Sequence, residues 1–293
     1  MVTAVYSSPG PRHKNEDSAL GIGFNVQTSN DNGGQSLLEV ATILIVLDGV
    51  SSAAYGYEGS HCGGALLAQN LIVDLCALAT DSNGSWNPAT LQAVCQQAVE
   101  AANAFLYQHA QGGLPSHVTT LVLLVHAGEH AVIVHLGDGT IYRFRDGRLT
   151  KLVREHTLLN ERPDADPVSS QGVITRALGK SPIAEADYQV VSTSPGDLFV
   201  LASDGVSGVL EASVLASIIA REIGASPVQS TLDRCAQAIV SAALLAGTTD
   251  NASVALGWVA PPSSNVTKVY VTPPTLVLAT GEVPTTNKRR KKT

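Results

Sequence analysis

The sequence predicts an α+β protein in which antiparallel β-sheets are covered by pairs of helices. Short β-branched runs follow one another through turn residues and do not alternate strictly with helices. Apolar spacing of helical type is instead gathered into two blocks, one before these runs and one after them. Hydrophobic residues make up 44% of the 293-residue chain and aromatic residues only 4%, so Ala, Val and Leu must build the core. This block order favours antiparallel sheets over a doubly wound parallel sheet.

The first part of the chain contains one predicted strand and two predicted helices. Residues 42–47 form an apolar run that reads as a buried strand ending at Asp48. A helical pattern follows from about residue 57 to 78. Asn87 before Pro88 then indicates an N-cap with proline in the first turn of a second helix. The apolar face predicted for that helix comprises Leu91, Val94, Ala98, Ala101 and Phe105.

The central part of the chain is predicted to be mostly strands. They cover residues 120–125, 131–136, 141–145 and 148–152, the last two joined by the hairpin dipeptide Asp146-Gly147. The polar, proline-bearing stretch 160–171 is predicted to be a surface flap. Strands near 188–192 and 198–202, helices near 212–223 and 228–246, and a closing strand at 252–259 complete the pattern. We therefore expect one domain over residues 1–258, followed by a flexible Pro/Thr-rich tail over 259–293.

Charge and cysteine usage limit the classes of partner. The net charge is −7, yet residues 260–293 hold six basic residues against Glu282, so the remainder carries −12. Such an acidic body suits divalent cations and disfavours specific nucleic-acid binding. The terminal KRRKK run is either a solvated charge cluster or a tether to an anionic membrane or an acidic partner. Four cysteines without metal spacing, no secretory signal and no apolar run of membrane-spanning length lead us to expect a cytoplasmic monomer with reduced thiols.

Acidic residues stand at the ends of several predicted strands. Three of them are followed by glycine, which lets the backbone turn sharply and bring a carbonyl close to a ligand. One Asp-Gly pair alone is more often a turn than a ligand. Several carboxylates gathered together would repel one another without a cation, and oxygen ligands are those that Mg²⁺ and Mn²⁺ prefer. The acids in question are Asp48, Asp138, Asp204 and Asp250, with the adjacent pair Glu16 and Asp17 near the start of the chain.

The order of these motifs resembles the PP2C-type (PPM) metal-dependent serine/threonine protein phosphatases over almost the whole chain. Each motif is weak alone, but nine occur in the family's order. They are residues 12–17 (RHKNED), 46–49 (VLDG), 119–120 (TT), 136–138 (LGD), 155–157 (EHT), 175–179 (TRALG), 196–197 (GD), 203–205 (SDG) and 250–251 (DN).

The resemblance implies a four-layer α/β/β/α sandwich, with two central antiparallel sheets flanked by antiparallel helix pairs. It also implies hydrolysis of phosphoserine and phosphothreonine in proteins by a water activated at two Mn²⁺ or Mg²⁺ ions, opposing a Ser/Thr kinase. The implied roles are a metal-bridging Asp48 with the Gly49 carbonyl, further ligands Asp204 and Asp250, water-holding Glu16 and Asp17, a looser third ion at Asp138, and a phosphate clamp at Arg12.

The chain also departs from the family pattern. Val50, Ser51 and Ser52 replace the usual glycines after the VxDG motif. A catalytically silent phosphoprotein-binding domain of the same fold is therefore the alternative function. His61 is the nearest candidate for a general acid; the alternative is a histidine at a helix start or on the surface. A haloacid-dehalogenase mechanism requires a nucleophilic aspartate two residues before Asp48, where this chain has Val46.

Overall fold

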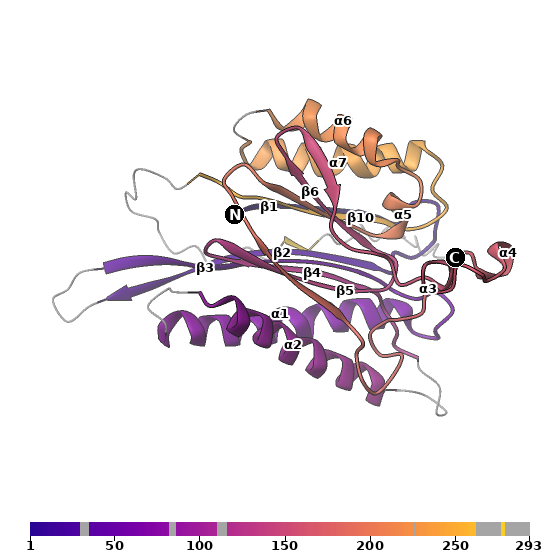
Figure 1. Cartoon of the computed structure of the whole chain (residues 1–293), viewed down its shortest axis with the longest axis horizontal. Helices are drawn as coiled ribbons and strands as arrows, with labels where there is room; N and C mark the ends of the chain where they lie inside the picture. Colours follow the sequence, from indigo (N-terminus) through magenta and orange to yellow (C-terminus); the bar gives the residue numbers. More distant parts are fainter. Residues whose placement is uncertain (30–34, 82–85, 110–115, 225–226, 262–276, 279–293) are drawn as a thin grey trace, which may run out of the picture.

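The computed structural model describes residues 1–29, 35–81, 86–109, 116–224, 227–261 and 277–278. Within them, two antiparallel sheets lie face to face between two layers of helices (Figure 1). Helices α1 (Gly56–Asp81) and α2 (Pro88–Gln108) cover one outer face, and α6 (Ala212–Ile223) and α7 (Gln229–Leu245) cover the other. The four-layer α/β/β/α sandwich is therefore confirmed.

The sheet beside α1 and α2, here called sheet B, has the order β11-β2-β3-β4-β5-β8. Its strands are β2 (Asp17–Ser29), β3 (Gln35–Asp48), β4 (Leu121–Ala127), β5 (His130–Leu136), β8 (Asp187–Ser192) and β11 (Val277–Leu278). In the antiparallel β2–β3 pair, Asp17 lies opposite Asp48. Two acidic residues are thus brought together at one end of the sheet by strand register alone.

The sheet beside α6 and α7, here called sheet A, has the order β1-β10-β9-β6-β7. Its strands are β1 (Val2–Ser8), β6 (Thr140–Arg145), β7 (Arg148–Lys151), β9 (Leu198–Ala202) and β10 (Ala252–Trp258). The β6–β7 turn has φ values of 51° at Asp146 and 76° at Gly147, as the hairpin prediction requires. The short helix α5 (Asp204–Ser207) follows β9, and α3 (Leu158–Glu161) and α4 (Pro167–Ser170) lie in the predicted flap region.

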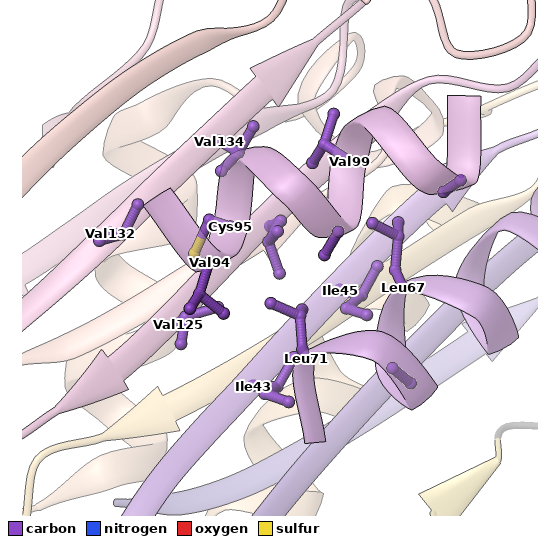
Figure 2. Close-up of a cluster of buried hydrophobic side chains, with 14 of the residues drawn as sticks. Ile43, Ile45, Leu67, Leu71, Val94, Cys95, Val99, Val125, Val132 and Val134 are labelled. Carbon is purple, nitrogen blue, oxygen red and sulfur yellow. The ribbon is translucent and has the colours of Figure 1, made fainter. Parts of the chain in front are cut away.

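Three apolar clusters hold the four layers together. The cluster between sheet B and its helices includes Ile43, Ile45 and Leu71 (Figure 2), while Leu44 and Val46 face the other sheet. Residues 42–47 read as a continuous apolar run because both faces of β3 are buried. The third cluster packs sheet A against α6 and α7.

The predicted face of α2 is wrong in part. Asn87 does cap the helix, since its Oδ1 accepts a hydrogen bond from the Ala89 amide at 2.9 Å. Ala101 and Phe105 are exposed, however, and the Phe105 ring lies against His109. The alanines on both sides of the helix do not distinguish the two faces by composition. The buried stripe contains Leu91, Val94, Cys95, Ala98, Val99, Ala102, Asn103 and Leu106.

Two other expectations need qualification. Within α1, the stretch Gly56–Ala79 is long and apolar enough to span a membrane by length and composition alone, with a mean hydropathy of 1.6 over an 18-residue window, contrary to the sequence prediction. In the structure Leu67, Leu71 and Leu75 of this helix pack on sheet B. Cys62 is exposed, whereas Cys95 and Cys235 are buried; all four thiols are free. The basic KRRKK run and nearly all of the predicted tail lie outside the described residues.

Candidate metal centre and active site

A cavity of about 570 Å³ opens at the end of the sandwich where the acidic residues meet. Asp48, Asp138, Asp204 and Asp250 line its wall together with the loop 49–53. Val118, Thr120, the segment 172–174 and Lys180 form the rest of the lining. Four carboxylates spaced over about 200 positions of the chain therefore face one common space.

Both sheets contribute to this wall. Asp48 ends β3 in sheet B, and Asp138 lies between β5 and β6. Asp204 begins α5 directly after β9 of sheet A, and Asp250 stands two residues before β10. The site is consequently built across the interface between the two sheets.

Local hydrogen bonds fix the backbone around Asp48. Its amide donates to Thr120 Oγ1 at 3.0 Å, and Thr119 Oγ1 donates to its carbonyl at 2.9 Å. At Gly49 the amide donates to the Glu16 carbonyl at 3.1 Å. A Cβ at this position would lie 2.3 Å from the Gly56 carbonyl oxygen, so only glycine fits.

Asp17 lies behind the cavity wall and is only 2% exposed. Its Oδ2 accepts a hydrogen bond from Ser203 Oγ at 2.9 Å, which joins the start of β2 to the residue before Asp204. Within the described residues its Oδ1 has no hydrogen-bond partner, and neither has Asp204 Oδ1. Buried carboxylate oxygens without a partner are costly unless a cation satisfies them.

The electrostatics of the acids lead to the same conclusion. Burial, reinforced by the charge of Asp204, raises the pKa of Asp138 to about 7. Burial also raises the pKa of Asp17 to about 7. Burial also raises the pKa values of Asp48 and Asp204, and the charge of Asp17 adds to the rise at Asp48. A bound cation would reverse these shifts because it stabilises the ionised forms.

The donor set fits a hard divalent cation that keeps part of its water shell. Among the described residues, no group of three or more His, Cys, Asp or Glu side chains is arranged so that it could hold a metal ion. Mg²⁺ is ordinarily held by one or two carboxylates and several waters, so such a group is not required. Carboxylate and carbonyl oxygens with no cysteine in the lining also disfavour a zinc site.

Arg12 is held by three contacts beside the cavity. Its Nη2 forms an ion pair with Asp250 Oδ2 at 2.7 Å, and its Nε donates to the Thr249 carbonyl at 3.1 Å. Its Nη1 donates to Ser51 Oγ at 3.1 Å. Ser51 Oγ in turn donates to Glu16 Oε2 at 2.9 Å. Arg12 and Glu16 are thus connected to the wall without lining it themselves.

The structure therefore arranges the predicted site residues in two tiers. Asp48, Gly49, Asp138, Asp204 and Asp250 line the cavity. The other three, Arg12, Glu16 and Asp17, lie around it and reach the wall through Asp250, Ser51 and Ser203.

Two histidines of the sequence analysis have structural contacts. His61 is not among the residues that line the cavity; its Nδ1 donates to the Tyr57 carbonyl at 2.9 Å, and its ring stacks on Tyr57. His156 Nδ1 accepts from the Gly137 amide at 3.2 Å, and its Nε2 contacts Asp187 at 3.1 Å. His156 thereby connects Gly137, the residue before Asp138, to Asp187.

Sequence reasoning did not predict the contacts that Ser51 makes at the site, and it did not identify Lys180 as part of the cavity lining. Ser51 appeared only as a departure from a glycine pattern, and its contacts connect segments that are 35 and 39 positions apart. Lys180 follows Gly179 and donates to the Ile174 and Thr175 carbonyls at 3.0 and 2.8 Å. No local sequence pattern around Ser51 or Lys180 predicts these contacts.

Comparison with known proteins places this geometry in a family. The family model described as "Protein phosphatase 2C" matches residues 27–245. The serine/threonine phosphatase stp of Listeria monocytogenes is 26% identical over 253 residues, which cover 84% of this chain and 90% of that protein. The solved Streptococcus agalactiae serine/threonine phosphatase has a TM-score of 0.62 at 22% identity, covering 87% of this chain and 97% of that one. The catalytic domain of the phosphatase PstP, solved in complex with two manganese ions, has a TM-score of 0.60 at 24% identity and covers 88% and 98%.

Proposed function

This chain belongs to the protein phosphatase 2C family, and from that premise we propose that it hydrolyses phosphoserine and phosphothreonine in proteins with Mg²⁺ or Mn²⁺ as cofactor. The observation that carries the proposal is the convergence of Asp48, Asp138, Asp204 and Asp250 on one cavity. The substrate is a phosphorylated protein, and the opposing enzyme is a Ser/Thr kinase. A cavity of about 570 Å³ open to solvent accommodates a phosphorylated side chain on a surface segment.

The acidic residues are assigned to the ions by their place in the site. Asp48 and Asp204, which line the same cavity, would hold the central ions together with Asp250 and the Gly49 carbonyl. Asp17 and Glu16, behind the wall, would orient water molecules. Asp138 would hold a further, weaker ion. When bound, the ions lower the pKa of water and neutralise the negative charge of the phosphoryl group.

Arg12 is assigned to the substrate phosphate. A guanidinium group has five N–H donors, and three of them are engaged with Thr249, Ser51 and Asp250. The two that remain belong to Nη1 and Nη2, one on each nitrogen. A planar cation with two free N–H donors can bind two oxygens of a phosphate.

The decisive experiment measures metal-dependent phosphate release. Chelated protein should be inactive toward p-nitrophenyl phosphate and a phosphothreonine peptide, and added Mn²⁺ should restore turnover. Asp204→Asn should lower kcat/KM by at least about a hundredfold while the fold is retained. Asp164→Asn, on the exposed flap, is the matched control and should leave activity unchanged.

The alternative is a silent domain that binds phosphoproteins without hydrolysing them. It would be supported by a wild-type protein that binds a phosphothreonine peptide in Mn²⁺ but releases no phosphate. Equal turnover in wild type and Asp204→Asn would contradict the proposed role of the acidic cavity, because that activity would arise elsewhere.

A further inference from the structure

We propose that Ser51 is a positioning residue that holds the Arg12 guanidinium in the orientation needed to receive the substrate phosphate. The proposal rests on the proposed function in so far as Arg12 is its phosphate-binding group. Ser51 stands in the loop that follows Asp48-Gly49, and this loop lines the cavity. Its hydroxyl lies between a cation and an anion that come from the first strand connection, 39 and 35 positions away.

The direction of both Ser51 hydrogen bonds is determined by chemistry. A serine hydroxyl has one hydrogen to donate and lone pairs that accept. Glu16 Oε2 can only accept as a carboxylate, so the Ser51 hydrogen points to it over 2.9 Å. Arg12 Nη1 can only donate, so it takes a lone pair of the same oxygen over 3.1 Å. Each bond strengthens the other because both end on a charged group.

Glu16 provides a fixed anchor for this arrangement. Its amide donates to Asn251 Oδ1 at 2.8 Å, and its carbonyl accepts from Ser60 Oγ at 2.5 Å and from the Gly49 amide at 3.1 Å. Asn251 is itself bound to the Pro9 and Lys14 carbonyls at 2.8 and 2.9 Å. Ser51 therefore connects Arg12 to a backbone that is held on both sides.

The contact with Ser51 restricts rotation of the Arg12 guanidinium, which the other two contacts leave free. Nε and Nη2 are adjacent nitrogens along one edge of the guanidinium plane, bound to Thr249 and Asp250. With that edge alone held, the plane can rotate about it. Contact through Nη1 adds a third fixed point and so defines the plane. The Arg12 side chain is 38% exposed, so it retains rotamer freedom that fixed contacts must restrict.

The test uses the Mn²⁺-loaded full chain and the variants Ser51→Ala, Ser51→Thr and Ser217→Ala. Ser51→Ala should raise KM for a phosphothreonine peptide about three- to tenfold, the effect of losing one charge-assisted hydrogen bond at a partly exposed site. It should weaken binding of inorganic phosphate, measured by calorimetry, by a similar factor and change kcat by less than about twofold. Ser51→Thr keeps the hydroxyl and should restore both values. Ser217→Ala, on the outer face of α6, should change neither.

A double-mutant cycle separates positioning from a general structural effect. In an Arg12→Ala background, Ser51→Ala should have no further effect on KM or on phosphate binding, because the group that it positions is gone. Additive losses in the double variant would overturn the proposal, as would a Ser51→Ala protein with unchanged phosphate affinity. If wild type releases no phosphate from any substrate, the proposed function fails, and the calorimetric cycle with inorganic phosphate still decides the role of Ser51. Absence of saturable phosphate binding to wild type would also refute it.

Discussion

Replacing Asp138 by asparagine should stabilise the metal-free protein at alkaline pH. The side chain keeps nearly the same shape and loses the charge that burial and Asp204 make unfavourable. The pKa of Asp138 is about 7 in the folded protein, against an ordinary value of 3.8. A difference of about three pKa units corresponds to about 4 kcal/mol, which is therefore the largest gain expected.

The sign of the pH dependence follows from the raised pKa. Below pH 3.8 the carboxyl is protonated in both states and costs nothing. Between 3.8 and about 7 the unfolded chain releases the proton more readily than the folded protein, so stability of the metal-free wild type falls as pH rises. Above pH 7 the ionised Asp138 carboxylate lowers the free energy of unfolding of the metal-free protein by its full amount. Asp138→Asn should thus match wild type near pH 4 and exceed it at pH 8.

Urea unfolding in excess chelator at pH 4 and pH 8, followed by circular dichroism, measures this difference. The free energy of unfolding of Asp164→Asn, on the exposed flap, should stay within about 0.5 kcal/mol of wild type at both pH values. Added Mn²⁺ should reverse the order, because the ion binds the wild-type carboxylate and not the amide, and metal titration of Asp138→Asn should lose its weakest site. An Asp138→Asn protein no more stable than wild type at pH 8 would refute the reasoning about buried repulsion.

Three further predictions concern the scaffold. Arg145→Ala should lower the free energy of unfolding by about 3 kcal/mol in urea titrations, because it leaves the fully buried Asp197 carboxylate without its bidentate partner. The pKa of His135 is lowered to about 4 by burial, so stability should decrease by up to about 3 kcal/mol as pH falls from 6.5 towards 4, measured in the same titration. Leu71→Ala should cost about 2–5 kcal/mol by thermal or urea unfolding, whereas Val73→Ala, 61% exposed on the same helix, should cost less than about 0.5 kcal/mol.

Each of these has an outcome that contradicts it. Retained stability in Arg145→Ala would mean that Asp197 finds another partner or is reached by water. A flat stability profile between pH 6.5 and 4 would show that His135 charges without cost. Equal losses in Leu71→Ala and Val73→Ala would place α1 differently on sheet B from the packing in Figure 2.

Much of the fold follows from local signals in the sequence. The strand at 42–47 is recognisable because both faces are buried, and Asn87-Pro88 marks the start of α2 because cap and proline each satisfy the first turn. The face of α2 is different: alanines surround the helix, and Phe105 is on the outside beside His109. Where side chains are small and uniform, only the packed structure distinguishes inside from outside.

The candidate site divides in the same way. Asp48 and Asp204 are predictable because Asp48 ends a strand, Asp204 lies two residues after the end of another, and each is followed by glycine. Their convergence on one cavity depends on the order and register of the strands. Neither can be inferred from the individual residues. The hydrogen bond between Arg12 and Ser51 is even harder to predict from the sequence, because it joins two loops through a single hydroxyl.

The division of the acids between the two sheets has a thermodynamic consequence. Asp48 belongs to sheet B and Asp204 follows a strand of sheet A, and apolar packing joins the sheets between them. An ion held by both residues must leave before the layers can come apart, so its binding free energy adds to the work of separating them. At an ion concentration one hundred times the dissociation constant that addition is about 2.7 kcal/mol. Depletion of the ion would accordingly lower the free energy of unfolding as well as stop the chemistry.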